Sequence, residues 1–170
     1  MSKAAGHECD VLSAVFSTDD VSVLTTSHDR SARIWNSKTG ECVQTLLGHK
    51  DTVWDAVFSP DSTSVFTASE DCTARIWDSK TGACMRIQMG HSESVNRARF
   101  SANCESVLTA SNDTTAKLWD FRTGACMRTL TGHRHTVASA VFSAYDASIL
   151  TASLDGTAKF WSLSTGQCSQ

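Results

Sequence analysis

The stretch "DCTARIWDSKTGAC" (residues 71–84) returns later in the chain as "DTTAKLWDFRTGAC" (residues 113–126). Related stretches are "DRSARIWNSKTGEC" at 29–42 and "DGTAKFWSLSTGQC" at 155–168. All four share an Asp, a Trp, a Gly and a Cys at the same positions. A catalytic site would need such side chains only once, so four equal copies predict a repeated architecture.

Three sets of residues keep a constant period of 42 residues along the chain, so no repeat contains an insertion or a deletion. The sets are His7, His49, His91, His133; Asp29, Asp71, Asp113, Asp155; and Trp35, Trp77, Trp119, Trp161. A fixed period in the low forties is typical of repeat proteins.

Each period contains short segments rich in β-branched and aromatic residues and shows no helical periodicity. In the second period we expect four antiparallel strands, with a turn at Pro60, a tight turn at Asp71 and a hairpin loop ending at Gly82. The expected strands are 53–59, 64–69, 73–77 and 83–89.

The first of these strands has apolar residues on both sides, because Val53, Ala56, Val57 and Phe58 cannot all point to one face of a pleated strand. A small sheet with two apolar faces must stack on neighbouring sheets. The sequence therefore predicts an all-β chain of four four-stranded antiparallel sheets, arranged radially as the blades of a propeller.

The combination of Gly-His, a later Asp and a strand ending in Trp-Asp resembles the WD40 repeat family of β-propellers. The resemblance covers residues 6–168, and the Gly-His pairs are Gly6-His7, Gly48-His49, Gly90-His91 and Gly132-His133. The last Asp of the pattern is present as Asp78 and Asp120 but is replaced by Asn36 and Ser162. The expected divisions are a leader at 1–5, repeats at 6–47, 48–89 and 90–131, and a fourth repeat at 132–170 with a shortened last strand.

The resemblance implies that one His, one Thr, one Asp and one Trp of each repeat form a hydrogen-bonded tetrad with a structural role. The tetrads are His7, Thr25, Asp29, Trp35; His49, Thr67, Asp71, Trp77; His91, Thr109, Asp113, Trp119; and His133, Thr151, Asp155, Trp161. A second hydroxyl on the same strand could share or take the role of the Thr. These residues are Ser27, Ser69, Ser111 and Ser153.

The resemblance also implies that partner proteins bind the face formed by the loops before the first strands and by the turns between the second and third strands. The candidate contact residues on this face vary between repeats. They are Asp10, Leu12, His28, Thr52, Trp54, Glu70, Ser94, Asn96, Asn112, Thr136, Ala138 and Leu154.

Two of the variable positions lead to specific hypotheses. Trp54 is the one tryptophan outside the periodic set, and it either anchors a partner or fills space near the propeller axis. Arg97 occupies the position that Asp55 has in the preceding repeat, which suggests an ion pair between adjacent blades. A solvated or partner-facing arginine is the alternative.

The composition limits the function classes. Lys and Arg number 15 against 18 Asp and Glu, for a net charge of −3, which does not indicate nucleic-acid or membrane-surface binding. No stretch approaches the roughly 20 apolar residues of a membrane span, and the first residues lack a signal peptide. We therefore expect an intracellular protein, cytoplasmic or nuclear, without nucleic-acid or membrane partners.

Four of the seven cysteines stand at one repeated position, and we expect them to be reduced and buried as small apolar residues. They are Cys42, Cys84, Cys126 and Cys168. No Cys-x-x-Cys pair, P-loop or Gly-x-Ser-x-Gly motif occurs, so we expect neither a metal nor a cofactor.

The leading hypothesis is a non-enzymatic scaffold that binds proteins or peptides. The alternative is a propeller that recruits substrates to a larger assembly such as a ubiquitin ligase or a kinase complex. A propeller with its own catalytic residues at the central channel is a third and weaker hypothesis.

Propellers have four to eight blades, and four blades of this kind would need strong curvature to close. Both end repeats keep an apolar pattern, as Val137, Val141, Phe142, Ile149 and Leu150 show for the last one. We therefore expect an open arc, which is either a piece of a longer propeller or half of an eight-bladed ring built as a homodimer.

Overall fold

The computed structural model describes residues 6–169, which fold into four antiparallel sheets of four strands each. In every sheet the strand order follows the chain order. Blade 1 contains β1 (Val11–Phe16), β2 (Ser22–Ser27), β3 (Ser31–Asn36) and β4 (Cys42–Leu47). Blade 2 contains β5 (Val53–Phe58), β6 (Ser64–Ser69), β7 (Ala74–Asp78) and β8 (Cys84–Gln88).

Blade 3 contains β9 (Val95–Phe100), β10 (Ser106–Ser111), β11 (Ala116–Asp120) and β12 (Cys126–Leu130). Blade 4 contains β13 (Val137–Phe142), β14 (Ser148–Ser153), β15 (Ala158–Ser162) and β16 (Cys168–Ser169). The prediction of an all-β chain with four four-stranded blades is confirmed. The last strand is short, with two residues.

The turns of blade 2 show why the chain reverses at these places. Cys72, in the turn between β6 and β7, has a φ of 65°, and Gly82, in the next turn, has a φ of 71°. The Asp78 carboxylate accepts hydrogen bonds from the backbone N–H groups of Lys80 (3.0 Å) and Thr81 (2.7 Å), which closes the loop before β8.

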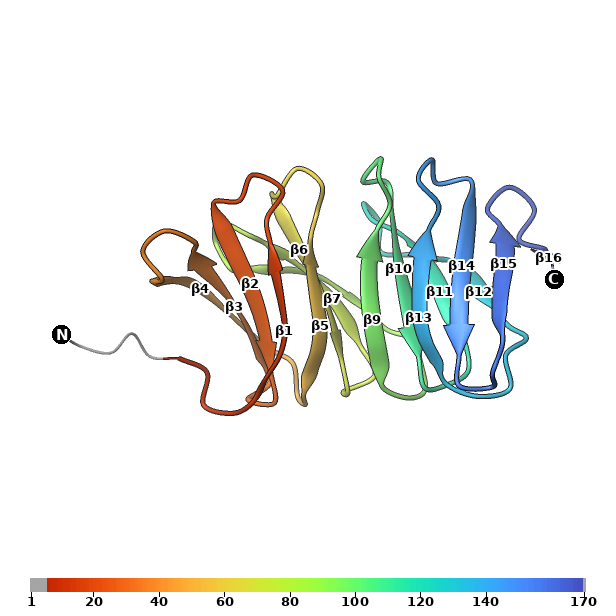
Figure 1. Ribbon diagram of the computed structural model, residues 1–170, viewed down its shortest axis with the longest axis horizontal. Coiled ribbons are helices and arrows are strands. Elements are labelled where there is room, and N and C mark those ends of the chain that lie inside the picture. Colours follow the sequence, from red (N-terminus) through yellow and green to blue (C-terminus); the bar gives the residue numbers. More distant parts are fainter. Residues whose placement is uncertain (1–5, 170) are drawn as a thin grey trace.

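The four blades stand side by side in chain order, with the two ends of the chain at opposite ends of the row (Figure 1). The apolar core consists of three clusters, and each cluster lies between two consecutive blades. Within residues 6–169, blades 1 and 4 do not close into a ring, so the expected open arc is confirmed. The expected leader at 1–5 and the last residue, Gln170, lie outside the described residues.

Polar bonds also join consecutive blades at their outer edges. In blades 1, 2 and 3, a side chain of the fourth strand (β4, β8 or β12) donates to a backbone carbonyl in the turn before the fourth strand of the next blade. The bonds are Gln44 Nε2 to Lys80 O (2.5 Å), Arg86 Nε to Arg122 O (2.7 Å) and Arg128 Nη2 to Ser164 O (3.2 Å).

The hypothesis of an Asp55–Arg97 ion pair is wrong. Asp55 is buried and its Oδ2 accepts from Arg99 Nη1 at 2.7 Å and from the backbone N–H of Ala98 at 3.2 Å. Equivalent positions on adjacent blades point in the same direction, so Asp55 faces blade 3 while Arg97 lies beside Thr136 and Ala138 of blade 4. The two side chains therefore do not meet.

The prediction of buried cysteines at the repeated position is also wrong. Cys84, Cys126 and Cys168 are exposed and Cys42 is half-buried. These residues begin the fourth strands, which are the outer edges of the blades and have no neighbouring strand beyond them. All seven cysteines are free.

Candidate functional site

The structure brings the four residues of each predicted tetrad together across one blade. In blade 2, His49 Nδ1 lies 2.9 Å from Asp71 Oδ2, and His49 Nε2 lies 2.7 Å from Thr67 Oγ1. The indole Nε1–H of Trp77 donates to the same Thr67 oxygen at 2.9 Å. The tetrad thus links the loop before β5, the strands β6 and β7 and the turn between them.

The chemistry of the groups sets the direction of these bonds. A carboxylate only accepts, so His49 Nδ1 carries the proton that is donated to Asp71. The other ring nitrogen of a neutral His49 then accepts from the Thr67 hydroxyl, and that oxygen accepts from Trp77. In this arrangement with a neutral imidazole, the His49, Thr67 and Trp77 donors each have an acceptor.

The pKa values agree with this assignment. Burial lowers the pKa of His49, against the opposing effect of Asp71, and burial likewise lowers the pKa of His91. Burial acts to raise the pKa of Asp71, but hydrogen bonds from His49, Thr73 and Lys50 outweigh it and the pKa falls well below its usual range. The tetrad therefore holds a neutral imidazole against an ionised carboxylate.

The other three blades repeat this geometry. The His Nδ1 to Asp Oδ2 distances are 2.8 Å for His7–Asp29, 2.7 Å for His91–Asp113 and 2.9 Å for His133–Asp155. The Trp Nε1 to Thr Oγ1 distances are 2.7 Å for Trp35–Thr25 and 2.9 Å for both Trp119–Thr109 and Trp161–Thr151.

A further hydroxyl belongs to each tetrad and was missed by the sequence analysis. The Thr73 hydroxyl donates to Asp71 Oδ1 at 2.6 Å. The equivalent donors in the other blades are Ser31, Thr115 and Thr157. The signal was present in the sequence, because a hydroxyl residue recurs two positions after every tetrad Asp.

The second set of hydroxyls takes a different place from the tetrad Thr. Ser69 Oγ accepts from the backbone N–H of Asp71 at 3.2 Å and donates to the carbonyl of Asp51. Ser27, Ser111 and Ser153 accept from the tetrad Asp of their own blades in the same way. These serines hold the turn that positions the carboxylate.

Five of the twelve candidate contact residues gather around one hollow of about 260 Å³ on the predicted partner face. This face is the lower edge of the blades in Figure 1, where the first strands begin. We call the hollow the Trp54 pocket; its lining is Trp54, Asn96, Arg97, Asn112, Thr136 and Ala138. Residues from three consecutive blades therefore meet there.

The polar groups of the Trp54 pocket differ in whether they have partners. Asn96 Nδ2 donates to Asn112 Oδ1 at 2.8 Å. Trp54 is half-buried and packs edge-on against His28, but its Nε1–H is buried and has no acceptor within residues 6–169. Arg97 is exposed, and its Nη1 donates to the backbone carbonyl of Asn96 at 3.5 Å.

The remaining candidates do not line this hollow. Thr52 is buried, and its hydroxyl lies 3.1 Å from His28 Nδ1 between blades 1 and 2. The others are spread over the same face, and they are Asp10, Leu12, His28, Glu70, Ser94 and Leu154. Arg97, which the sequence analysis placed in an ion pair with a solvated or partner-facing arginine as the alternative, is the sixth lining residue of the pocket.

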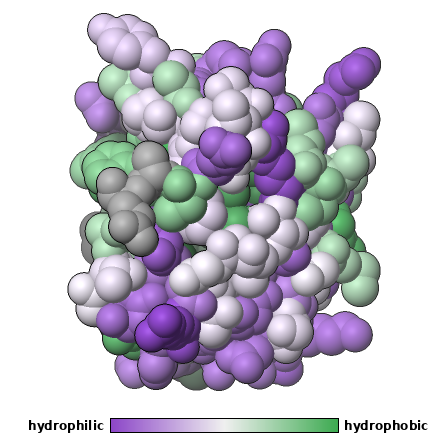
Figure 2. Space-filling view, turned by 90° about the vertical axis from the view of Figure 1, so that its right-hand side faces the viewer, coloured by the Kyte–Doolittle hydropathy of each residue, from purple (hydrophilic) through white to green (hydrophobic). Residues whose placement is uncertain are grey.

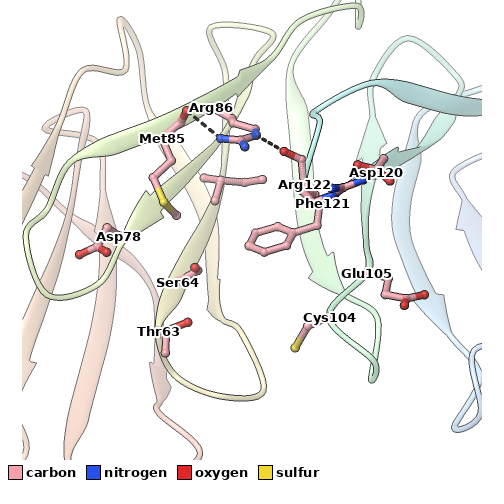
Figure 3. A pocket seen from close by; sticks show the side chains of 11 residues that line it. Thr63, Ser64, Asp78, Met85, Arg86, Cys104, Glu105, Asp120, Phe121 and Arg122 are labelled. Atoms are coloured by element: carbon pink, nitrogen blue, oxygen red, sulfur yellow. Dashed lines mark hydrogen bonds between the residues drawn. The ribbon is translucent and has the colours of Figure 1, made fainter.

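A larger groove of about 780 Å³ lies between blades 2 and 3 at their outer rim. Figure 3 shows Phe121 reaching into it from one blade and Met85 from the other, with Arg86 bonded to the Arg122 carbonyl across the top. The equivalent groove between blades 1 and 2 has Val43 and Ser79 at the places of Met85 and Phe121. The groove is therefore a recurring product of blade packing.

Residues 6–169 contain no group of three or more His, Cys, Asp or Glu side chains that could hold a metal ion. Over the same range no helix has the length and apolar character needed to cross a membrane.

Comparison with known proteins supports the repeat assignment. The family model described as "WD domain, G-beta repeat" matches residues 2–36, 40–78, 82–120 and 124–162, which is most of the chain. A search of curated proteins found no match. With four matched repeats and four blades of the corresponding strand order, the chain belongs to the WD40 repeat family.

Proposed function

We propose that this chain is a non-enzymatic scaffold that binds a segment of a partner protein in the Trp54 pocket. WD40 repeat domains are typically protein-interaction scaffolds. The observation that carries the proposal is that Trp54, whose buried indole N–H lacks an acceptor within residues 6–169, lines the same hollow as the exposed guanidinium of Arg97. Buried donors normally have a partner, so a ligand that brings an acceptor is favoured.

The same two groups define the chemistry of the partner. Arg97 offers several N–H donors and a positive charge, and Trp54 offers apolar area together with one donor. Asn96 and Asn112 already bond to each other, which fixes the wall between them. We infer that the bound segment presents a carboxylate to Arg97 and a backbone or side-chain oxygen to Trp54.

We propose a structural role for the four tetrads. The Thr hydroxyls that accept the Trp indole N–H groups and contact the His rings are themselves buried, with Thr67, Thr109 and Thr151 at 0% exposure, so a substrate cannot reach them. The supporting observation is burial, because the His49 and His91 side chains are 1% and 2% exposed.

We also propose an intracellular location, which is supported by seven free thiols.

A random-peptide display selection against the purified chain tests the binding proposal. We expect enriched peptides to contain Asp or Glu, and we expect Trp54→Ala and Arg97→Glu each to weaken their binding at least about tenfold. Arg122→Glu, an exposed arginine at the outer rim, is the matched control and should retain binding. Peptides that bind all variants equally would contradict the proposal.

The alternative is that the chain recruits substrates to a ligase or kinase assembly. In this case the same pocket would bind a substrate of that assembly. Affinity purification with the wild-type chain and with Trp54→Ala separates the two ideas. A catalytic subunit that co-purifies with both forms, while other proteins are lost from Trp54→Ala, would favour the recruiting role.

A further inference from the structure

Every contact between consecutive blades joins two different apolar faces. We call the side of a blade that faces the preceding blade its leading face and the opposite side its trailing face. Between blades 2 and 3, the trailing face consists of Val57, Phe66, Ala68, Ala74 and Ile76. The leading face that meets it consists of Val95, Ala98, Phe100, Val107 and Trp119.

The leading face of blade 1 has no blade packed against it, yet it carries the same five residue types at the same repeat positions. They are Val11, Ala14, Phe16, Val23 and Trp35. Val11 is 53% exposed whereas its blade 3 counterpart Val95 is fully buried, and Phe16 is 64% exposed whereas its counterpart Phe100 is half-buried. Blade 1 thus presents a complete leading face that no blade within residues 6–169 covers.

The trailing face of blade 4 is free in the same way and carries the complementary set. It consists of Val141, Leu150, Ala152, Ala158 and Phe160. Leu150 stands at the position of Phe66 in blade 2, and Phe160 stands at the position of Ile76. Both faces therefore contain one aromatic and one aliphatic residue at these two positions, in opposite order. Figure 2 looks onto this end of the molecule, where hydrophobic residues lie across the middle height.

We propose that two copies of this chain associate head to tail, with the trailing face of blade 4 in each copy packed on the leading face of blade 1 in the other. The contact would repeat the one already made three times within each chain, between the same kinds of residue. Two such contacts cover all four free faces and close a ring of eight blades, within the range known for propellers.

The leading face of blade 1 binds the trailing face of a second copy rather than the leading face of that copy, because leading and trailing faces differ in shape. Leading faces carry a Trp and a Phe, and trailing faces carry small residues that leave room for those rings: two alanines in blades 2 and 3, and Ala32 with Thr26 in blade 1. In all three internal contacts a leading face meets a trailing face. The free faces of one chain are therefore complementary to each other and not to themselves.

The first test is the mass of the purified 170-residue chain by light scattering and sedimentation. We expect twice the 18.3 kDa of one chain. A particle of 18.3 kDa with a cooperative thermal transition at all concentrations would overturn the proposal.

The second test distinguishes a head-to-tail contact from a symmetric one. Phe16→Arg damages only the leading face and Phe160→Arg only the trailing face, so each variant alone is expected to be a single chain. A mixture of the two retains one intact pair of faces and is expected to regain the two-chain mass. A symmetric contact predicts instead that one of the variants remains a dimer by itself, which would overturn the proposal.

Controls separate loss of assembly from loss of folding. Tyr145→Arg changes an aromatic residue that is 93% exposed in a turn and should leave the mass doubled. Circular dichroism checks that the variants are folded, and Val11→Glu with Val141→Glu provides a second pair. If the wild-type chain aggregates and both face variants still aggregate, the closed two-chain ring is overturned. It is also overturned if the wild-type chain forms long polymers that both variants abolish.

Discussion

The substitution Asp71→Ala tests how much one tetrad stabilises the fold. The Asp71 carboxylate accepts four hydrogen bonds, from His49 Nδ1, the backbone N–H of Lys50, and the backbone N–H and hydroxyl of Thr73. Without it, the His49 Nδ1–H is left buried with the distant Thr73 hydroxyl, at 3.5 Å, as its remaining acceptor, which costs about 1–3 kcal/mol. The three other donors are closer to solvent and can turn to water, so their loss adds about 1 kcal/mol.

We therefore expect the free energy of unfolding to fall by about 2–4 kcal/mol, and the melting temperature by roughly 5–15 °C for a chain of this size. The assay is thermal and urea unfolding followed by circular dichroism and by tryptophan fluorescence. The matched control is Glu70→Ala, which removes an exposed acid at the adjacent position and should change stability by less than about 0.5 kcal/mol. If the two variants unfold at the same midpoint, the buried-donor argument is refuted.

Acidification from about pH 7 to pH 5 is expected to lower the free energy of unfolding. The pKa of His49 is lower in the fold than in the unfolded chain, so in this window the unfolded chain binds protons that the folded chain does not. Below about pH 4 the lowered pKa of Asp71 also makes the free energy of unfolding fall on acidification. A urea midpoint that rises on acidification would contradict the lowered pKa values of both His49 and Asp71. The Asp55–Arg99 pair is tested by a double-mutant cycle, in which Asp55→Ala and Arg99→Met should show a coupling of about 1 kcal/mol, reduced by the partial exposure of the arginine. The same cycle with Arg97→Met should show none.

Local sequence rules were sufficient for the strands and turns of each blade. The strands expected at 53–59 and 64–69 appear as Val53–Phe58 and Ser64–Ser69, because β-branched residues and turn formers alternate clearly along each repeat. The resemblance to the WD40 family implied that one His, one Thr, one Asp and one Trp of each repeat belong together, and the shared period located the His, Asp and Trp in every repeat. The strands and turns recur in every blade because the same strand-forming and turn-forming residues recur in every repeat.

Contacts between blades could not be predicted from the period alone. Asp55 bonds to Arg99 rather than to Arg97, because equivalent side chains on adjacent blades point the same way and a long side chain can reach around a strand. The exposure of Cys84 follows from its place on an edge strand, which its neighbours in sequence do not reveal.

The Trp54 pocket likewise depends on tertiary structure. Its lining residues are spread from position 54 to position 138, and only the stacking of three blades brings their side chains around one hollow. The sequence by itself determined the all-β blades and their number, and its resemblance to the WD40 family implied the His, Thr, Asp and Trp of each tetrad, since those features arise within one repeat. The tertiary structure decided the ion pair, the exposed cysteines and the pocket, because they depend on the direction and spacing of neighbouring blades.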